Sequence, residues 1–217
     1  MKRNPLNTNH QLLHGDHFLG SPVQTKHGHL ITNHLQRIHD CLYRTFEHHS
    51  RICVMRFDLY VPDHVSPDVL LSNTLISKFL ASMRAKIEHS QAQSRNQDRR
   101  VHEADMRYMW CRETSSTGRV HYHVALVLNH AAYAFVGKFD LASRNMYARI
   151  HGAWASALGM YIDDMQGYVH VPLKPTYQII RDDADSFLHV FYRLSYFAKM
   201  HTKEYNQGFH TFGCSTN

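Results

Sequence analysis

Residues 106–128 read MRYMWCRETSSTGRVHYHVALVL and contain the pattern that decides the fold. Both ends of this stretch are rich in β-branched and aromatic residues, which favour strands. The polar segment TSSTG (114–118) between them ends in glycine and is typical of a hairpin turn. The stretch therefore predicts an antiparallel hairpin with strands at 106–113 and 119–128.

The second of these strands has two unlike sides, because alternate side chains of a strand share a face. Tyr122 and its alternating apolar neighbours from Val120 to Leu128 form the predicted core side. His121 and His123 project together from the other, less apolar side. Two neutral imidazoles held next to each other are good ligands for a divalent transition metal.

The same triplet could also occur by chance, because the chain contains 20 histidines. Composition predicts roughly two His-x-His triplets by chance. The sequence has this one and His27-Gly28-His29, so the triplet is informative only through its strand context. The triplet at 27–29 lies in an aperiodic segment and is expected to be solvated.

Glu113, at the end of the first predicted strand, is the natural third ligand of such a metal site. If it lies opposite His121, its carboxylate is on the histidine face. A register shift of one residue would turn it to the other face, and the sequence does not determine the register. The alternative is a solvent-exposed hairpin glutamate that pairs with Arg119.

Hydrophobic spacing predicts the remaining elements outward from the hairpin. Helices are expected at about 30–48, 66–90, 140–158 and 182–204, strands at 51–62 and 167–173, and a polar loop or frayed helix end at 89–100. Without the first and last helices the order is βαββαβ, the ferredoxin-like pattern. The expected fold class is α+β: a ferredoxin-like antiparallel sheet with helices on one face, an N-terminal helix and a C-terminal helix that carries tyrosines.

The chain is expected to divide into three segments. Residues 1–29 are rich in Asn, His, Gly and Thr without periodicity and are expected to be a flexible arm. Residues 30–205 are expected to form one domain, and residues 206–217 a C-terminal tail.

Composition excludes several classes of protein. The 217 residues carry a formal charge of +6, which fits a polyanionic partner. Mean hydropathy is −0.44, and no apolar run approaches the roughly 18 residues of a membrane span. The basic N-terminal stretch lacks the apolar core of a secretory signal. The four cysteines are scattered and form no Cys-x-x-Cys pair, which argues against a zinc ribbon or a disulfide scaffold and favours a reducing cytoplasm.

The last predicted helix places Tyr192, Tyr196, Lys199 and Lys203 within about 60° of one another, opposite an apolar stripe. A phenol, whose pKa is about 10, needs nearby positive charge to attack a phosphate, so a tyrosine one turn before a lysine suits a nucleophile. About 0.4 Tyr-x-x-Lys matches are expected by chance. The alternative is a pair of surface aromatics that keep their hydroxyls in water.

The two motifs in this order resemble the HUH endonucleases, the group that includes the rolling-circle replication initiators. These proteins have a His-hydrophobic-His triplet on a sheet strand and a tyrosine nucleophile on a later helix, commonly as Tyr-x-x-Lys. Here the triplet is HYH (121–123), and the helix reads YRLSYFAK (192–199), which resembles the two-tyrosine form of single-stranded DNA phage initiators. GRVHYHVALVLNHAAY (118–133) and RLSYFAKMHTK (193–203) are also similar to the prophage and filamentous-phage replication group that carries the YagK/YfjJ domain.

This resemblance, which covers about residues 30–205, implies a mechanism. The substrate would be single-stranded DNA at the replication origin of a phage, prophage or plasmid, in the cytoplasm of a bacterial host. Mg²⁺ or Mn²⁺ would bind to His121, His123 and Glu113. Tyr196 would be the nucleophile and form a 5′-phosphotyrosine, while Lys199 would offset charge on the phosphate or lower the pKa of the tyrosine.

Other residues receive further roles from the resemblance. Tyr192 would perform a second strand transfer, or it would be a surface aromatic that stacks on a base. Arg112, Arg119 and Lys203 are candidates for DNA backbone contacts because they neighbour the motifs. No Gly-rich phosphate-binding loop is present. A host helicase and polymerase would therefore supply unwinding and synthesis.

The chain departs from the family pattern in its first strand, where Arg56 and Asp58 stand in place of a Thr-rich signature. Three other classes of function stay open. One is an HUH transposase or relaxase with the same chemistry. The second is a non-catalytic nucleic-acid-binding module, because ferredoxin-like sheets also bind RNA. The third is a histidine-rich metal-binding protein without nuclease activity.

Overall fold

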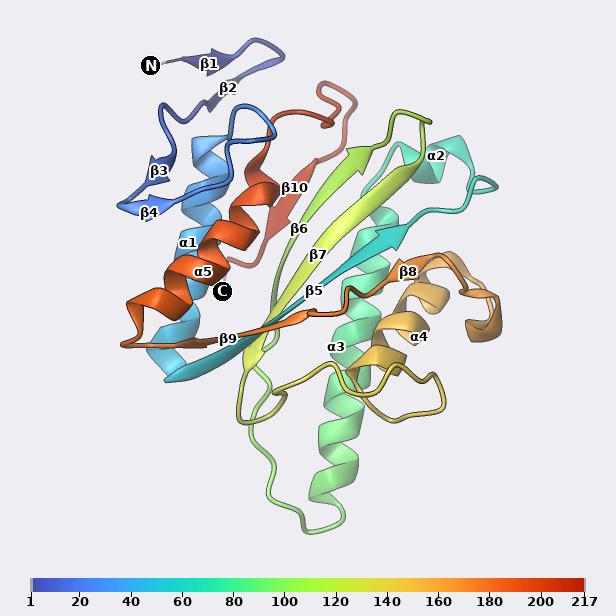
Figure 1. Ribbon diagram of the computed structural model, residues 1–217. Coiled ribbons are helices and arrows are strands. Elements are labelled where there is room, and N and C mark those ends of the chain that lie inside the picture. Colours follow the sequence, from blue (N-terminus) through green and yellow to red (C-terminus); the bar gives the residue numbers. More distant parts are fainter. Residues whose placement is uncertain (1, 217) are drawn as a thin grey trace.

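The computed structural model describes residues 2–216. The protein has an α+β fold built on an antiparallel sheet (Figure 1). The sheet has the strand order β10-β6-β7-β5-β8, and β9 also pairs with β5. In sheet order the strands are β10 (Phe212–Cys214), β6 (Arg107–Thr114), β7 (Val120–Asn129), β5 (Arg51–Tyr60), β8 (Val169–His170) and β9 (Thr176–Ile180). The long hairpin of β6 and β7 and its partner β5 form the centre of the molecule.

Helices cover both faces of this sheet. The helices α1 (Thr32–His48) and α5 (Ala184–Ser195) lie on one side, and α3 (Thr74–Arg95) and α4 (Met146–Leu158) lie on the other (Figure 1). The two helices of the predicted βαββαβ pattern, α3 and α4, therefore lie on one face as expected, and the N-terminal and C-terminal helices cover the other. Ala125 and Val127, which share the histidine side of β7, are fully buried in the cluster that contains α1 and α5.

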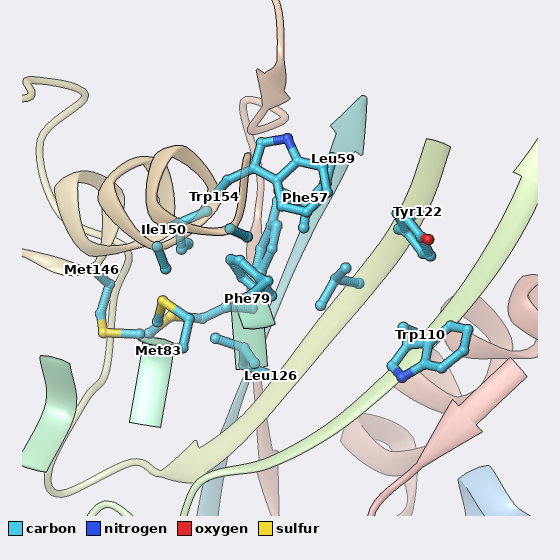
Figure 2. Close-up of a cluster of buried hydrophobic side chains, with 14 of the residues drawn as sticks. Phe57, Leu59, Phe79, Met83, Trp110, Tyr122, Leu126, Met146, Ile150 and Trp154 are labelled. Carbon is cyan, nitrogen blue, oxygen red and sulfur yellow. The ribbon is translucent and has the colours of Figure 1, made fainter. Parts of the chain in front are cut away.

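The core on the α3 and α4 side is built from large apolar side chains (Figure 2). Phe79 from α3 and Trp154 from α4 meet edge to face, with ring centroids 6.1 Å apart. The indole Nε1 of Trp154 donates a hydrogen bond of 3.0 Å to the backbone oxygen of Tyr60, so its polar atom is satisfied inside the core. This contact also ties α4 to the end of β5, where the histidine face is open.

Several predicted elements are confirmed closely. The strands β6 and β7 each begin and end within one residue of the prediction, and β5 begins at the predicted residue. The helix α4 ends at Gly159, which adopts a left-handed conformation with φ of 69° and closes the helix as glycine does at this position.

Other boundaries are wrong. The helix predicted at 66–90 is two helices, α2 (Pro67–Leu70) and α3, and α3 continues to Arg95 because Ile87 and Gln91 are still buried. The helix α4 starts at Met146 and not at residue 140. Asn145 caps this start by accepting a hydrogen bond from the backbone N–H of Ala148. The strand predicted at 167–173 is only the two-residue β8, and β9 was not predicted.

The last helix is also shorter than predicted. α5 ends at Ser195 instead of continuing to about residue 204, and a single 3-10 turn, η2 (Tyr196–Ala198), follows. At Lys199 the backbone is extended, with ψ of 140°. The four residues expected to share one helical stripe therefore do not share it.

The predicted arm and tail both pack on the domain. Residues 2–29 form two small hairpins instead of a mobile arm, from β1 (Arg3–Asn4) with β2 (Asn7–Gln11) and β3 (His17–Phe18) with β4 (Ser21–Pro22). Phe18 and Val23 are buried in the core cluster of α1 and α5. The predicted tail supplies β10, which pairs with β6 as an edge strand. Within residues 2–216, no helix has both the length and the apolar character needed to cross a bilayer.

Gly213 in β10 and Gly152 in α4 differ in the space around them. Alanine should therefore have opposite effects on stability at these two positions. A Cβ at Gly213 would lie against the Trp110 ring, whereas a Cβ at Gly152, in α4, would meet only ordinary contacts from 3.5 Å outward. Gly213→Ala should lower the free energy of unfolding by about 1–3 kcal/mol through overpacking. Gly152→Ala should raise it by up to about 1 kcal/mol, because alanine is the better helix former. Urea unfolding measures both changes, and an unchanged Gly213→Ala variant would contradict the packing of β10.

Candidate metal and tyrosine site

The register of four strands brings the polar side chains of the site into two adjacent rows. Glu113 of β6 lies directly opposite His121 of β7, as the metal-ligand hypothesis requires. His121 in turn lies opposite Tyr60 of β5, and their rings stack with centroids 5.6 Å apart. Because paired residues of neighbouring strands point to the same face, this row lies on the histidine face.

The second row runs parallel to the first, two residues further along β7. His123 lies opposite Asp58 of β5, and Asp58 lies opposite His170 of β8. Asp58 accepts a hydrogen bond from Nδ1 of His123 at 2.6 Å, and Nδ1 of His170 is 3.3 Å from its other oxygen. Asp58 is thus placed between two imidazoles.

Asp58 determines which nitrogen of His123 is available. Burial alone would raise the pKa of Asp58, but its hydrogen bonds with the two imidazoles hold that pKa below its usual value. An ionised carboxylate can only accept, so Nδ1 of His123 must carry the proton. Nε2 is left buried and without a hydrogen-bond partner, 3.3 Å from Oε2 of Glu113.

Glu113 is a buried carboxylate surrounded by cations and imidazoles, with an exposed fraction of 3%. The Lys199 ammonium is 2.8 Å from Oε2, and the Lys203 ammonium is 3.8 Å from Oε1. Burial would raise the pKa of Glu113, but His123 and the two lysines hold it far below its usual value. The alternative of an exposed glutamate paired with Arg119 is wrong, since Arg119 instead lies 3.6 Å from Asp63.

The side chains of Glu113, His121 and His123 are arranged as a divalent metal ion would require. Ligand atoms of Glu113, His121 and His123 lie within 4.8 Å of one another, and they form a possible metal-binding triad. Nε2 of His123 is buried without a hydrogen-bond partner among the described residues, and a bound cation would supply one. Asp58 fixes the orientation of the His123 ring through the hydrogen bond from Nδ1, as carboxylates commonly do for metal-bound histidines. The donor set of two imidazoles and one carboxylate suits several divalent ions.

Tyr196 joins this group from the end of α5. Its ring packs edge to face on the His123 ring, with centroids 5.2 Å apart. The Lys199 ammonium donates a short hydrogen bond to its hydroxyl and also pairs with Glu113. Burial raises the pKa of Tyr196, and the Lys199 hydrogen bond opposes that rise only in part. The structure thus brings Tyr196 and Lys199 together with the triad.

The N-terminal segment holds the turn that carries Tyr196. Ile31 donates a backbone hydrogen bond of 2.8 Å to Ala198, and Met200 donates one of 2.9 Å to His29. His27, expected to be solvated, packs its ring edge to face on Tyr196 at 5.2 Å. The segment predicted as a flexible arm is therefore one wall of the site.

The other predicted site residues lie elsewhere. Tyr192, one turn before Tyr196, is 38% exposed, and among the described residues its ring does not contact the rings of His121 or His123. Arg112 is 3% exposed, with its guanidinium 3.8 Å from the centre of the Phe209 ring. Lys203 is also buried and donates to the backbone oxygen of Lys199. Arg112 and Lys203 are therefore not free to contact a DNA backbone, and only Arg119 of that trio has an exposed side chain.

Sequence reasoning missed three members of the site: Asp58, Tyr60 and His170. All three depend on long-range strand pairing, which local patterns do not reveal. A signal for Asp58 did exist, because it is the only acidic residue in the strand at 51–60. Such a residue at a central strand needs a partner, and His123 is that partner.

Comparison with known proteins places the chain in context. The family model of the YagK/YfjJ C-terminal domain matches residues 13–215. The chain is 30% identical to the uncharacterized protein YagK of Escherichia coli (strain K12) over 201 residues, which are 88% of this chain and 96% of that protein. It is 27% identical to the uncharacterized protein YfjJ of the same strain over 197 residues, 85% of this chain and 94% of YfjJ. No solved structure matches the chain.

The burial of Glu113 beside two ammonium groups predicts a large effect of removing it. Glu113→Ala should lower the free energy of unfolding at neutral pH by about 3–5 kcal/mol, because Lys199 and Lys203 would be left without their counter-charge. The double variant Glu113→Ala/Lys203→Met should recover part of that loss. Urea unfolding of the single and double variants tests the coupling, and strictly additive changes would show that the two side chains do not interact.

The hydrogen bond between Asp58 and His123 predicts a defect in metal binding. An amide at position 58 can donate to Nδ1 and move the ring proton to Nε2, which removes the lone pair of the ligand. Asp58→Asn should therefore weaken Mn²⁺ binding about 10- to 100-fold in calorimetric titration. Asp63→Asn is the matched control, because Asp63 is exposed and contacts Arg119. Equal affinities of the two variants would contradict the assignment.

Proposed function

The chain belongs to the YagK/YfjJ C-terminal domain family, and we propose that it cleaves and rejoins single-stranded DNA through a covalent tyrosine intermediate. The observation that carries this proposal is the contact of Tyr196 with His123 and, through Lys199, with Glu113. A phenol, an ammonium and a set of metal-ligating groups then converge at one point. These are the groups that attack on a phosphodiester requires.

The same arrangement supports a place among the HUH endonucleases. The strands β8-β5-β7-β6 are adjacent in this order, α3 connects β5 to β6, and α4 lies between β7 and β8. This connection is consistent with the ferredoxin-like βαββαβ arrangement. The triplet HYH lies on the central strand β7, and Tyr196 follows on a later helix, as in the two-motif pattern.

The proposed step begins with DNA held at the open end of β7. The phenolic oxygen of Tyr196 forms a bond to the phosphorus of the scissile phosphodiester, and the bond from phosphorus to the 3′ oxygen breaks. The phenolic proton is lost and one proton is taken up by the leaving 3′ oxygen, so the products are a 5′-phosphotyrosine and a free 3′-hydroxyl. The reverse reaction with another 3′-hydroxyl rejoins the strand without ATP, because the new ester keeps the energy of the phosphodiester.

Individual residues have distinct tasks in this step. Glu113, His121 and His123 would hold a divalent ion, Mg²⁺ or Mn²⁺ in the cell, which when bound polarises a non-bridging phosphate oxygen. Lys199 orients the hydroxyl of Tyr196 and places a positive charge beside the developing phenolate. Asp58 is a positioning residue that fixes the orientation of the His123 ring.

Tyr192 is proposed to act in a second transfer. Its phenolic oxygen would bond to the phosphorus of a second phosphodiester, and the 3′-hydroxyl released there would attack the phosphotyrosine at Tyr196, which rejoins the strand and frees the Tyr196 phenol. Tyr192 lies on α5 one turn before Tyr196, and its exposure leaves the ring accessible to DNA. This role suits initiation of rolling-circle replication of a phage, prophage or plasmid. The proposal places the protein in the bacterial cytoplasm and requires a host helicase and polymerase as partners.

A covalent-adduct assay tests the function. Oligonucleotides that cover candidate phage and prophage origins, labelled at the 3′ or the 5′ end, are incubated with protein and Mn²⁺ or EDTA and run on a denaturing gel. A 5′-phosphotyrosine should leave only the 3′-end label on the protein, and the band should require Mn²⁺. Tyr196→Phe should abolish the band, because phenylalanine has no nucleophilic oxygen.

Tyr192→Phe is the matched control, since it removes the same hydroxyl one helical turn away. It should keep the first adduct and reduce the release of rejoined product. A band that survives Tyr196→Phe but not Tyr192→Phe would reassign the nucleophile. Tight binding of single strands without an adduct for any oligonucleotide would instead favour the non-catalytic nucleic-acid-binding module.

A further inference from the structure

A basic groove lies between α3 and α4, on the sheet face opposite the tyrosine site. Its volume is about 760 Å³, and it is lined by Lys86, Arg99, Arg144 and Arg149 together with serine and glutamine side chains. None of the described residues that line it is Asp or Glu. We propose that this groove binds the phosphate backbone of duplex DNA while the opposite face processes a single strand.

The charge of the groove is uncompensated. None of its four lysine and arginine side chains has a carboxylate within 4.0 Å in the described part of the chain, whereas Arg95, at the end of α3, is paired with Glu103. Unpaired cations in a concave surface focus a positive potential and attract polyanions. The formal charge of +6 of the whole chain acts in the same direction.

Part of the groove is already organised for an anion. Nη2 of Arg149 donates a hydrogen bond of 2.7 Å to the hydroxyl of Ser90, and its guanidinium lies 5.7 Å from the centre of the Tyr133 ring. These contacts restrict the side chain, so less entropy is lost when it binds a phosphate. Lys86 extends over Gly152 of α4, where the absence of a Cβ leaves the ammonium room, 3.5 Å from the place a Cβ would take.

The residue types favour duplex over single-stranded DNA. Proteins that bind single strands stack the bases on aromatic side chains, and the described lining of the groove has no Phe, Tyr or Trp. Lysine, arginine, serine and glutamine instead match contacts to phosphates, which supply affinity without reading sequence. Partly exposed aromatic rings, those of Tyr60 and Tyr196, are found at the tyrosine site on the other face. The choice of DNA among polyanions rests on the proposed function.

The test measures binding of a fluorescent 30-base-pair duplex of mixed sequence by anisotropy across a salt series. Arg99→Gln/Arg144→Gln removes two exposed cations of the groove, and Lys174→Gln is an exposed control outside it. The double variant should bind about tenfold or more weakly at 0.1 M salt. Its slope of log affinity against log salt should be smaller by about 2, or about 1 for each lost phosphate contact. The control should change little.

A second pair of variants separates charge from folding. Gly152→Glu places a carboxylate beside Lys86 and should abolish binding of the duplex through the groove. Gly152→Ala should bind the duplex as the parent chain does. Each variant is also tested for the single-strand adduct, which should be unchanged. Duplex binding that is unaffected by both groove variants would overturn the groove inference and leave the nicking proposal standing. Groove-dependent duplex binding by a chain that forms no adduct would support the groove and contradict the nicking.

Discussion

The buried carboxylate of Glu113 is the interaction on which the rest of the site depends. It stands at the end of β6 and is surrounded by two imidazoles and two ammonium groups. A carboxylate at this depth is tolerable only with such partners. Lys199 and Lys203, which follow the end of α5 at Ser195, pair with this carboxylate, and Lys199 also contacts Tyr196 beside His123. The same buried charge therefore links the segment after α5 to the position of the tyrosine.

The local parts of this arrangement could be read from the sequence. Alternation in β7 separated a histidine face from a core face, and the turn TSSTG indicated which strands pair. The pairing of Glu113 with His121 was one of two registers that the sequence allowed, and the structure has that register. The Tyr-x-x-Lys spacing also identified Lys199, which pairs with Glu113, and Tyr196, whose hydroxyl Lys199 contacts. Each of these inferences involves residues separated by few positions along the chain.

The parts that depend on distant segments could not be read in this way. Helical spacing continued past Ser195 in the sequence, but the buried lysines turn the chain into an extended path, so the predicted stripe of Tyr192 to Lys203 does not form. Asp58 and His170 reach the site only through strand pairing across β5. Arg112 was a candidate for DNA backbone contact because it neighbours the motifs, yet it packs against Phe209 from the last segment of the chain.

The isolated bridge between Leu30 and Lys199 links the N-terminal hairpins to the tyrosine turn. Hydrogen bonds from Ile31 and Met200 flank it, and His27 rests on the Tyr196 ring. Small two-stranded ribbons have little stability of their own and open more readily than a central sheet. Opening of residues 2–31 would then expose both the edge of the turn and the phenol. Amide exchange in the first thirty residues should thus report on the resting state of a side chain that lies 169 positions beyond His27 in the sequence.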